Sequence, residues 1–347
     1  MDIQSSHFDH TDIENLGLGA GVLPYTVDEK GEIHVLLGRE RFMPSWKGSC
    51  RWSGFEGSRK PNETMTNTAM REFLEESLGV VLNEQEISTI INNKTYSIRI
   101  VLKILHDRRS ERYHCTYVVQ IPWDTTIPNK FKEMRHKIEH IDRLTQEWKH
   151  MLPMFLKDID CVGPIQTLED GRVCIHSDPH STPCILRSPW KIVSEGDDIV
   201  VRAFVESEDA EQLLKWEHLR HKLENILFDH PCIKVTRDAT FNMIKSVDIA
   251  MDHLEKDQVR WWRVSDLNDV LKNKGSLGHE RFRPYFLPVL QTFLTEIVGY
   301  DSPICQPIES ADESSEQSSL ETVNFDEGVL SRPLSVPVLE CSDREDA

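Results

Sequence analysis

A helix with two unlike faces is the feature that most limits what this chain can fold into. It is predicted between Pro61, which suits the first turn of a helix, and Gly79, which suits the left-handed residue that follows a helix end. Because successive residues turn by about 100°, Glu72, Glu75 and Glu76 fall within one arc of about 100°. The side chains that cover the rest of the wheel are Thr66, Ala69, Met70, Phe73, Leu74, Ser77 and Leu78. Such a helix is expected to pack one face on a core and to turn its acids outward.

The three glutamates point to a bound cation. Like charges on one helix face repel by roughly a few tenths of a kcal/mol per pair, a cost that a cation removes. Arg71, four residues before Glu75, can hold a carboxylate in place. Oxygen ligands without nearby Cys or His favour Mg²⁺ or Mn²⁺ over Zn²⁺, and such ions bridge to substrate phosphates. The pattern indicates phosphoryl or pyrophosphoryl chemistry, with an acidic, solvated helix face as the alternative.

Segment 57–80 resembles the box of the Nudix hydrolases, G-x5-E-x7-R-E-U-x-E-E-x-G-U, in which U is a bulky aliphatic residue. The residues in register are Gly57, Glu63, Arg71, Glu72, Glu75 and Glu76, with Phe73 at the first U position. The segment departs from the pattern in two places. Ser77 and Leu78 both stand before Gly79, where the pattern has one residue. Glu56 stands where many members carry a glycine, and it could tune the metal site or lie outside it.

The resemblance implies a metal-dependent hydrolase. The ligands that it assigns to Mg²⁺ or Mn²⁺ are Glu72, Glu75, Glu76 and the carbonyl of Gly57. A salt bridge between Arg71 and Glu63 would orient these catalytic acids. Water would attack a phosphorus of a nucleoside diphosphate linked to a group X, giving a nucleoside monophosphate and X-phosphate. The general base would come either from the box or from a separate loop.

The resemblance also implies an α+β fold, a Nudix-type α/β/α sandwich with a mixed sheet, over residues 15–123 and 257–298. The local patterns agree, since β-rich and helical stretches flank the box. The elements expected are a hairpin of strands 19–27 and 33–38, a second hairpin over 95–120 turning near 107–110, a strand over 259–264, a helix over 266–271 with Ser265 as its N-cap, and a final helix over 286–298.

The chain divides into four expected parts. Residues 1–14 form a flexible N-terminus, and residues 15–298 form the hydrolase domain. A large, partly helical insertion, residues 124–256, interrupts this domain. Residues 299–347 hold 12 acidic and 2 basic side chains of a chain whose net charge is −18, so they are expected to form a disordered acidic tail.

Composition limits the cellular setting. The sequence has no apolar run of about 18 residues, so a membrane span is not expected. Its start lacks the basic and apolar regions of a secretory signal, so such a signal is not expected either. Its 8 cysteines are scattered without a Cys-x-x-Cys pair, which favours reduced thiols in the cytoplasm, with the nucleus also open. The acidic balance disfavours a broad nucleic-acid-binding face. Oligomeric state is left open by these patterns.

Four side chains are candidates for substrate binding. Arg39 and Arg41 follow a predicted strand and could contact phosphate oxygens. Trp52 and Phe55 could stack on a base, although such aromatic rings are more often part of a core. The expected partner is a small diphosphate or nucleotide. Two alternatives are an mRNA cap-hydrolysing enzyme, with the insertion as an RNA path, and a non-catalytic nucleotide-binding sensor or scaffold.

Overall fold

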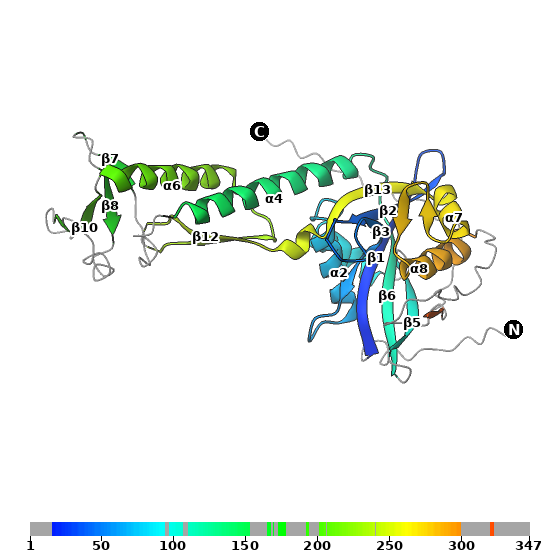
Figure 1. Ribbon diagram of the computed structural model, residues 1–347. Helices are drawn as coiled ribbons and strands as arrows, with labels where there is room; N and C mark the ends of the chain where they lie inside the picture. The colour runs from blue at the N-terminus through cyan, green and yellow to red at the C-terminus, as the bar shows by residue number, and fades with distance from the viewer. Residues whose placement is uncertain are drawn as a thin grey trace, which may run out of the picture.

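The computed structural model describes most of the chain between residues 16 and 299, together with a short strand beyond it. The described residues are 16–93, 97–106, 110–152, 165–167, 169, 173–177, 192–193, 201–205, 207–239, 241–299 and 320–322. They build a mixed sheet with helices on both faces, from which an elongated part projects (Figure 1). The expected α+β class is confirmed.

The main sheet has ten strands, in the order β14-β15-β3-β2-β1-β6-β5-β16, with β13 paired to β2 and β4 paired to β1. Its strands are β1 (Gly17–Val27), β2 (Ile33–Glu40), β3 (Arg51–Ser53), β4 (Phe55–Ser58), β5 (Ser97–His106), β6 (Ser110–Gln120), β13 (Lys256–Arg263), β14 (Ser276–Leu277), β15 (Glu280–Phe282) and β16 (Leu320–Thr322). The β1/β6 and β15/β3 pairs are parallel and the other pairs are antiparallel, so the sheet is mixed.

Helices cover the two faces of this sheet because neighbouring strand residues point to opposite sides. The helices are α2 (Met65–Glu76), α3 (Glu84–Asn92), α7 (Val264–Lys272) and α8 (Phe286–Thr292), which continues into the π-helical turn η4 (Phe293–Ile297). Val22 packs in the core that contains Phe73 of α2, whereas its neighbour Leu23 packs in the core that contains Leu267 of α7 and Phe286 of α8. The predicted α/β/α sandwich is present.

The segment between β6 and β13, called the arm below, projects from one side of the sandwich (Figure 1). Its elements are α4 (Ile127–His150), β7 (Ile165–Thr167), β8 (Val173–Ser177), β9 (Ile192–Val193), β10 (Val201–Val205), α6 (Ser207–Ile226), β11 (Ile233–Arg237), β12 (Ile244–Ile249) and η3 (Met251–Leu254). Trp148 of α4 stacks on Trp216 of α6, with 5.5 Å between ring centroids. The core beneath α2 continues into the arm through Phe131 and Ile138.

Several boundaries differ from those that the sequence predicts. Helix α2 begins after Thr64, whose side chain accepts a hydrogen bond from the Asn67 amide at 3.1 Å, and not at Pro61. Helix α7 begins after Arg263, so Ser265 lies inside the first turn and is not the N-cap. A hydroxyl cap fixes the first of these ends, and the close of strand β13 fixes the second.

The segment 1–14 that was expected to be flexible and the expected turn near 107–110, apart from Ser110, lie outside the described residues. The same holds for nearly all of the expected acidic tail, 299–347. Within that tail, β16 pairs antiparallel with β5 at the edge of the main sheet. In the part of the chain that the structure describes, no helix combines the length and the apolar character needed to cross a membrane.

Candidate active site

Helix α2 places the box side chains against strand β4. The N-cap Thr64 fixes the start of the helix, and four residues of the segment then meet in one cluster. Arg71 is the centre of this cluster, because its guanidinium reaches three carboxylates and one carbonyl. Its partners are Glu63 (Nε to Oε1, 2.6 Å; Nη2 to Oε2, 3.0 Å), Glu72 (Nη1 to Oε1, 2.7 Å), Glu75 (Nη1 to Oε2, 3.0 Å) and the Ser58 carbonyl (Nη2, 3.0 Å). The salt bridge between Arg71 and Glu63 that the resemblance implies is therefore present.

Glu63 lies in the loop before α2 and is held from several directions. Its Oε2 also accepts hydrogen bonds from the Lys60 amide at 3.1 Å and from the Thr68 hydroxyl at 3.0 Å. The hydrogen bond from Arg71, reinforced by these two, lowers the pKa of Glu63 to about 2. Glu63 is therefore a permanent anion at neutral pH, and it fixes the direction in which Arg71 points.

Glu72 lies against the backbone of strand β4 at Gly57. A Cβ added to Gly57 would lie 2.2 Å from the carboxyl carbon of Glu72, so only glycine leaves room for this acid. Burial raises the pKa of Glu72, and Arg71 opposes this shift. The Glu72 carboxylate and the Gly57 backbone thus lie next to each other.

Glu76 departs from the expected outward-facing position, since only 2% of its side chain is exposed. Its Oε2 accepts a hydrogen bond from the Glu56 amide at 2.8 Å, and its Oε1 lies 3.2 Å from Nζ of Lys256. Burial raises the pKa of Glu76 well above its usual range, against the attraction of Lys256. The prediction that all three acids look outward is wrong for Glu76, because α2 turns this residue toward the sheet.

Lys256 is fully buried and ties this part of the site together. Its Nζ donates to Glu40 Oε1 at 2.6 Å and to the Ser53 hydroxyl at 3.0 Å, and Arg283 also donates to Glu40 Oε1 at 2.7 Å. Lys256 stands opposite Glu40 in the register of β13 with β2. Sequence reasoning missed Glu40, Lys256 and Arg283, because each comes from a different segment and none belongs to a local motif.

Glu56, the second departure from the box pattern, belongs to the site. Its amide binds Glu76, and its Oε2 lies 2.9 Å from Nε2 of His114 on β6. Burial would raise the pKa of Glu56, but the hydrogen bond and charge of His114 outweigh burial and lower it. Its Oε1 is buried without a hydrogen-bond partner among the described residues. His114 is a further residue that the sequence patterns did not indicate.

The four substrate-binding candidates lie in different surroundings. Arg41 lies beside Glu255, because its amide donates to the Glu255 carbonyl at 2.7 Å. Arg39 forms a two-point ion pair with Asp257, at 2.8 and 3.2 Å. The Nε of Arg41 is buried and has no hydrogen-bond partner within the described part of the chain. Trp52 and Phe55 are fully buried, on opposite faces of the sheet, and Trp52 donates its Nε1 hydrogen to Glu280 at 2.6 Å. As placed, both rings serve as core side chains.

The donor set around Arg71 fits a hard divalent cation. Three carboxylates, Glu63, Glu72 and Glu75, face one guanidinium, which leaves two negative charges. Lys60 lies 3.6 Å from Glu75, but 53% of its side chain is exposed, so water screens this pair. All of the available donors are oxygens, as Mg²⁺ and Mn²⁺ prefer.

A second acidic group lies next to the first. Oxygens of Glu40, Glu76 and Glu255 approach one another within 4.8 Å, the spacing of a cation site. Glu40 and Glu76 are buried, whereas Glu255 is exposed. Because Lys256 contacts both buried members, this second position already holds a positive charge from the protein.

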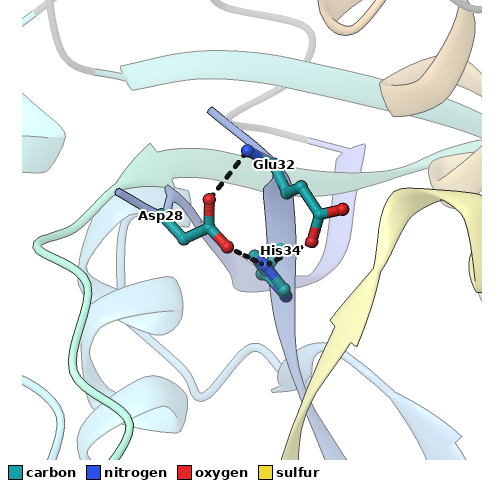
Figure 2. Close-up of side chains that lie close together, drawn as sticks. All are labelled: Asp28, Glu32 and His34. Atoms are coloured by element: carbon teal, nitrogen blue, oxygen red, sulfur yellow. Dashed lines mark hydrogen bonds and ion pairs between the residues drawn. The ribbon is translucent and has the colours of Figure 1, made fainter. Parts of the chain in front are cut away.

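Another group of acid and histidine side chains closes the β1–β2 hairpin, away from the box (Figure 2). Asp28 Oδ1 accepts hydrogen bonds from the amides of Lys30 and Glu32, at 2.9 and 2.8 Å, and Oδ2 lies 3.1 Å from Nε2 of His34. The His34 ring packs on Trp123, with 4.6 Å between centroids. Both oxygens of Asp28 therefore stabilise its own turn.

No protein-family model and no curated protein matches the chain. Solved structures to which it is similar include the following three, two of which are described as Nudix proteins. They are a Nudix hydrolase from M. smegmatis, RenU (15% identity, 31% of this chain and 63% of that one, TM-score 0.22), an Ap4A hydrolase binary complex from C. elegans (19%, 30% and 68%, 0.20), and the NUDIX domain of Shewanella oneidensis NrtR complexed with ADP ribose (14%, 34% and 68%, 0.22). The chain thus spans less than two thirds of RenU. At these TM-scores the likenesses carry no weight on activity.

Proposed function

We propose that this chain is a Mg²⁺- or Mn²⁺-dependent hydrolase of the Nudix type, which cleaves a diphosphate linkage in a nucleoside diphosphate linked to a group X. One observation carries the proposal: Arg71 holds Glu63, Glu72 and Glu75 in a single cluster at the Gly57 backbone. These residues are the matched positions of the box. A solvated acidic face would not need a guanidinium bound to three acids.

The metal ligands in this proposal are Glu72, Glu75, Glu76 and the Gly57 carbonyl. A divalent ion bound there would polarise the phosphorus and lower the pKa of a bound water. The protein's own part is to fix the acids before substrate arrives. Arg71 sets the side-chain positions of Glu72 and Glu75, and Glu63 holds Arg71 at two points.

The Glu56 amide fixes Glu76 from the other side. Glu72 and Glu75 keep 13% and 14% of their side chains exposed, so a phosphate group can approach them, whereas only 2% of the Glu76 side chain is exposed. The arrangement thus presents two acids to substrate and anchors the third in the fold.

The test is phosphate-product release by the full chain with Mg²⁺ or Mn²⁺. The panel contains ADP-ribose, NADH, diadenosine polyphosphates, nucleoside triphosphates, inositol pyrophosphates, free cap analogue and capped RNA. Glu75→Gln should lower turnover by about 100-fold or more, since it removes a ligand charge while keeping the shape. The matched control is Glu133→Gln, at an exposed position on α4.

Each result of the panel has a distinct meaning. Turnover of one substrate class that Glu75→Gln abolishes and Glu133→Gln leaves intact supports the proposal and names the substrate. Capped RNA hydrolysed faster than free cap analogue would assign the cap-hydrolysing version. Full turnover by Glu75→Gln would reject the site. Nucleotide binding without turnover of any panel member would favour a sensor or scaffold.

A further inference from the structure

The site described above offers cations two neighbouring positions that share Glu76. The first is the group that Arg71 holds, Glu63, Glu72 and Glu75, in which one guanidinium leaves two of three negative charges unbalanced. The second lies between Glu76 and Glu40, two buried acids on elements far apart in the sequence. The two positions differ in how many positive charges of the protein already face their acids.

The two buried acids of the second position are matched by cations of the protein without any added ion. Glu40 and Glu76 face the ammonium of Lys256, at 2.6 and 3.2 Å, and the guanidinium of Arg283 donates to Glu40 at 2.7 Å. The two buried carboxyl groups therefore meet two cations, and the third member of the group, Glu255, is exposed. A metal ion entering here would have to displace a lysine that is fully buried and hydrogen-bonded also to the Ser53 hydroxyl.

The backbone that carries Lys256 is itself fixed. Arg135, on helix α4 of the arm, donates from Nη1 to the carbonyl of Leu254 at 3.0 Å and also to the carbonyl of Lys256. The partner strand β2 places Glu40 directly opposite Lys256. Lys256 is thus held both at its backbone carbonyl and at its ammonium group.

We propose that Lys256 is a positioning residue that takes the place of a second cation, so that the chain binds a single exchangeable divalent ion, at the ligand set proposed above. The inference rests on the proposed metal-dependent function. Lys256 would hold Glu76 at Oε1 while the Glu56 amide holds Oε2, so Glu76 would reach the metal through the remaining lone pairs of these oxygens. The chain would then require one metal ion, because the Lys256 ammonium supplies the positive charge at the second position.

The experiment counts Mn²⁺ bound to the full chain by electron paramagnetic resonance, which measures the signal of free Mn²⁺ during a titration. The wild type should bind one Mn²⁺ tightly. Lys256→Met keeps the length of the side chain and removes the charge, so Glu40 and Glu76 become available and a second Mn²⁺ should bind. Lys149→Met, at an exposed lysine paired with Asp248 on the arm, should bind one. Circular dichroism of each variant checks that it is folded.

Glu40→Gln provides an answer that does not depend on the folding of Lys256→Met. If Lys256 occupies the second position, Glu40→Gln should still bind one Mn²⁺ with an affinity within about twofold of the wild type. Loss of Mn²⁺ in Glu40→Gln would make Glu40 a metal ligand and overturn the inference.

Two further outcomes separate this inference from the proposed function. Two tightly bound Mn²⁺ in the wild type, or one in folded Lys256→Met, would overturn the role of Lys256 and leave the hydrolase proposal standing. No Mn²⁺ bound by the wild type would reject the metal-dependent hydrolase itself, and this inference with it.

Discussion

Arg71 and Glu63 meet at two points, with Nε 2.6 Å from Oε1 and Nη2 3.0 Å from Oε2. A planar guanidinium held at two points has a fixed direction, so its Nη1 faces Glu72 and Glu75. Glu63, in the loop, thus determines which acids accept the remaining hydrogen bonds of Arg71 on the helix.

Glu63→Gln should make the fold less stable at neutral pH and less sensitive to acid. The pKa of Glu63 is about 2 in the folded chain and about 4.3 in an unfolded one, so its ionised form stabilises the fold above about pH 4.3. This contribution is lost as the pH falls from about 4.3 toward 2. Urea unfolding at several pH values should show the gap between wild type and Glu63→Gln narrowing below pH 4.3. A gap that is constant with pH would contradict the assignment.

Gly57→Ala should damage the site more than the fold. Its Cβ would lie 2.2 Å from the Glu72 carboxyl carbon, so Glu72 must move and Mn²⁺ affinity should fall about 10-fold or more. Gly79→Ala is the comparison: with φ +62° and open space around it, it should cost about 1 kcal/mol of stability and leave Mn²⁺ affinity unchanged. Mn²⁺ titration and thermal unfolding of both variants test the contrast, and equal losses of affinity would refute it.

His230→Phe should destabilise the end of helix α2 by about 1–3 kcal/mol. The extra residue of the box, Leu78, has φ 55°, and its carbonyl accepts a hydrogen bond from Nε2 of His230 at 3.2 Å. The Cys232 amide donates to Nδ1 of the same ring, which leaves Nε2 as the donor. Urea unfolding measures the loss, and His221→Phe, on the exposed side of α6, serves as control. Equal stability of the two variants would show that the bond to Leu78 contributes nothing.

Phe55→Leu should lower stability by about 1–2 kcal/mol and leave KM unchanged. The Phe55 ring is fully buried and packs edge-on against Phe73 of α2, with 5.4 Å between centroids. It therefore belongs to the core and does not face substrate. Steady-state kinetics on whichever substrate the panel identifies measures KM, and a severalfold rise at constant stability would return Phe55 to the substrate site.

The part of the site that sequence patterns predict comes from one continuous segment. Helical spacing alone places Arg71, Glu72 and Glu75 together, because all three lie within two turns of one helix. The burial of Glu76 was not predicted, because a helical wheel gives the direction of a side chain around the helix axis but not the position of the neighbouring sheet. The start of α2 was misplaced for a similar reason, because the hydroxyl cap at Thr64 determines it and Pro61 does not.

The rest of the site depends on pairing between distant strands. Glu40, His114 and Lys256 come from β2, β6 and β13, and their meeting follows from the register of the sheet. Alternating apolar residues identify a strand but do not specify its register, and one residue of slip turns a side chain to the other face. Lys256 also lies outside the strand expected over 259–264, because a pattern of apolar residues does not include a charged lysine.

Lys256 is the first residue of strand β13 in the sandwich and the last residue of the predicted insertion, 124–256. An arm excised at residues 124–256 would take this lysine with it, along with Arg135, which holds its backbone. Glu40 and Glu76 would then be left as buried acids without their shared counter-charge. The arm is therefore not an interchangeable module: excision at these bounds would divide the candidate site, so arm and sandwich have to be kept together as one unit.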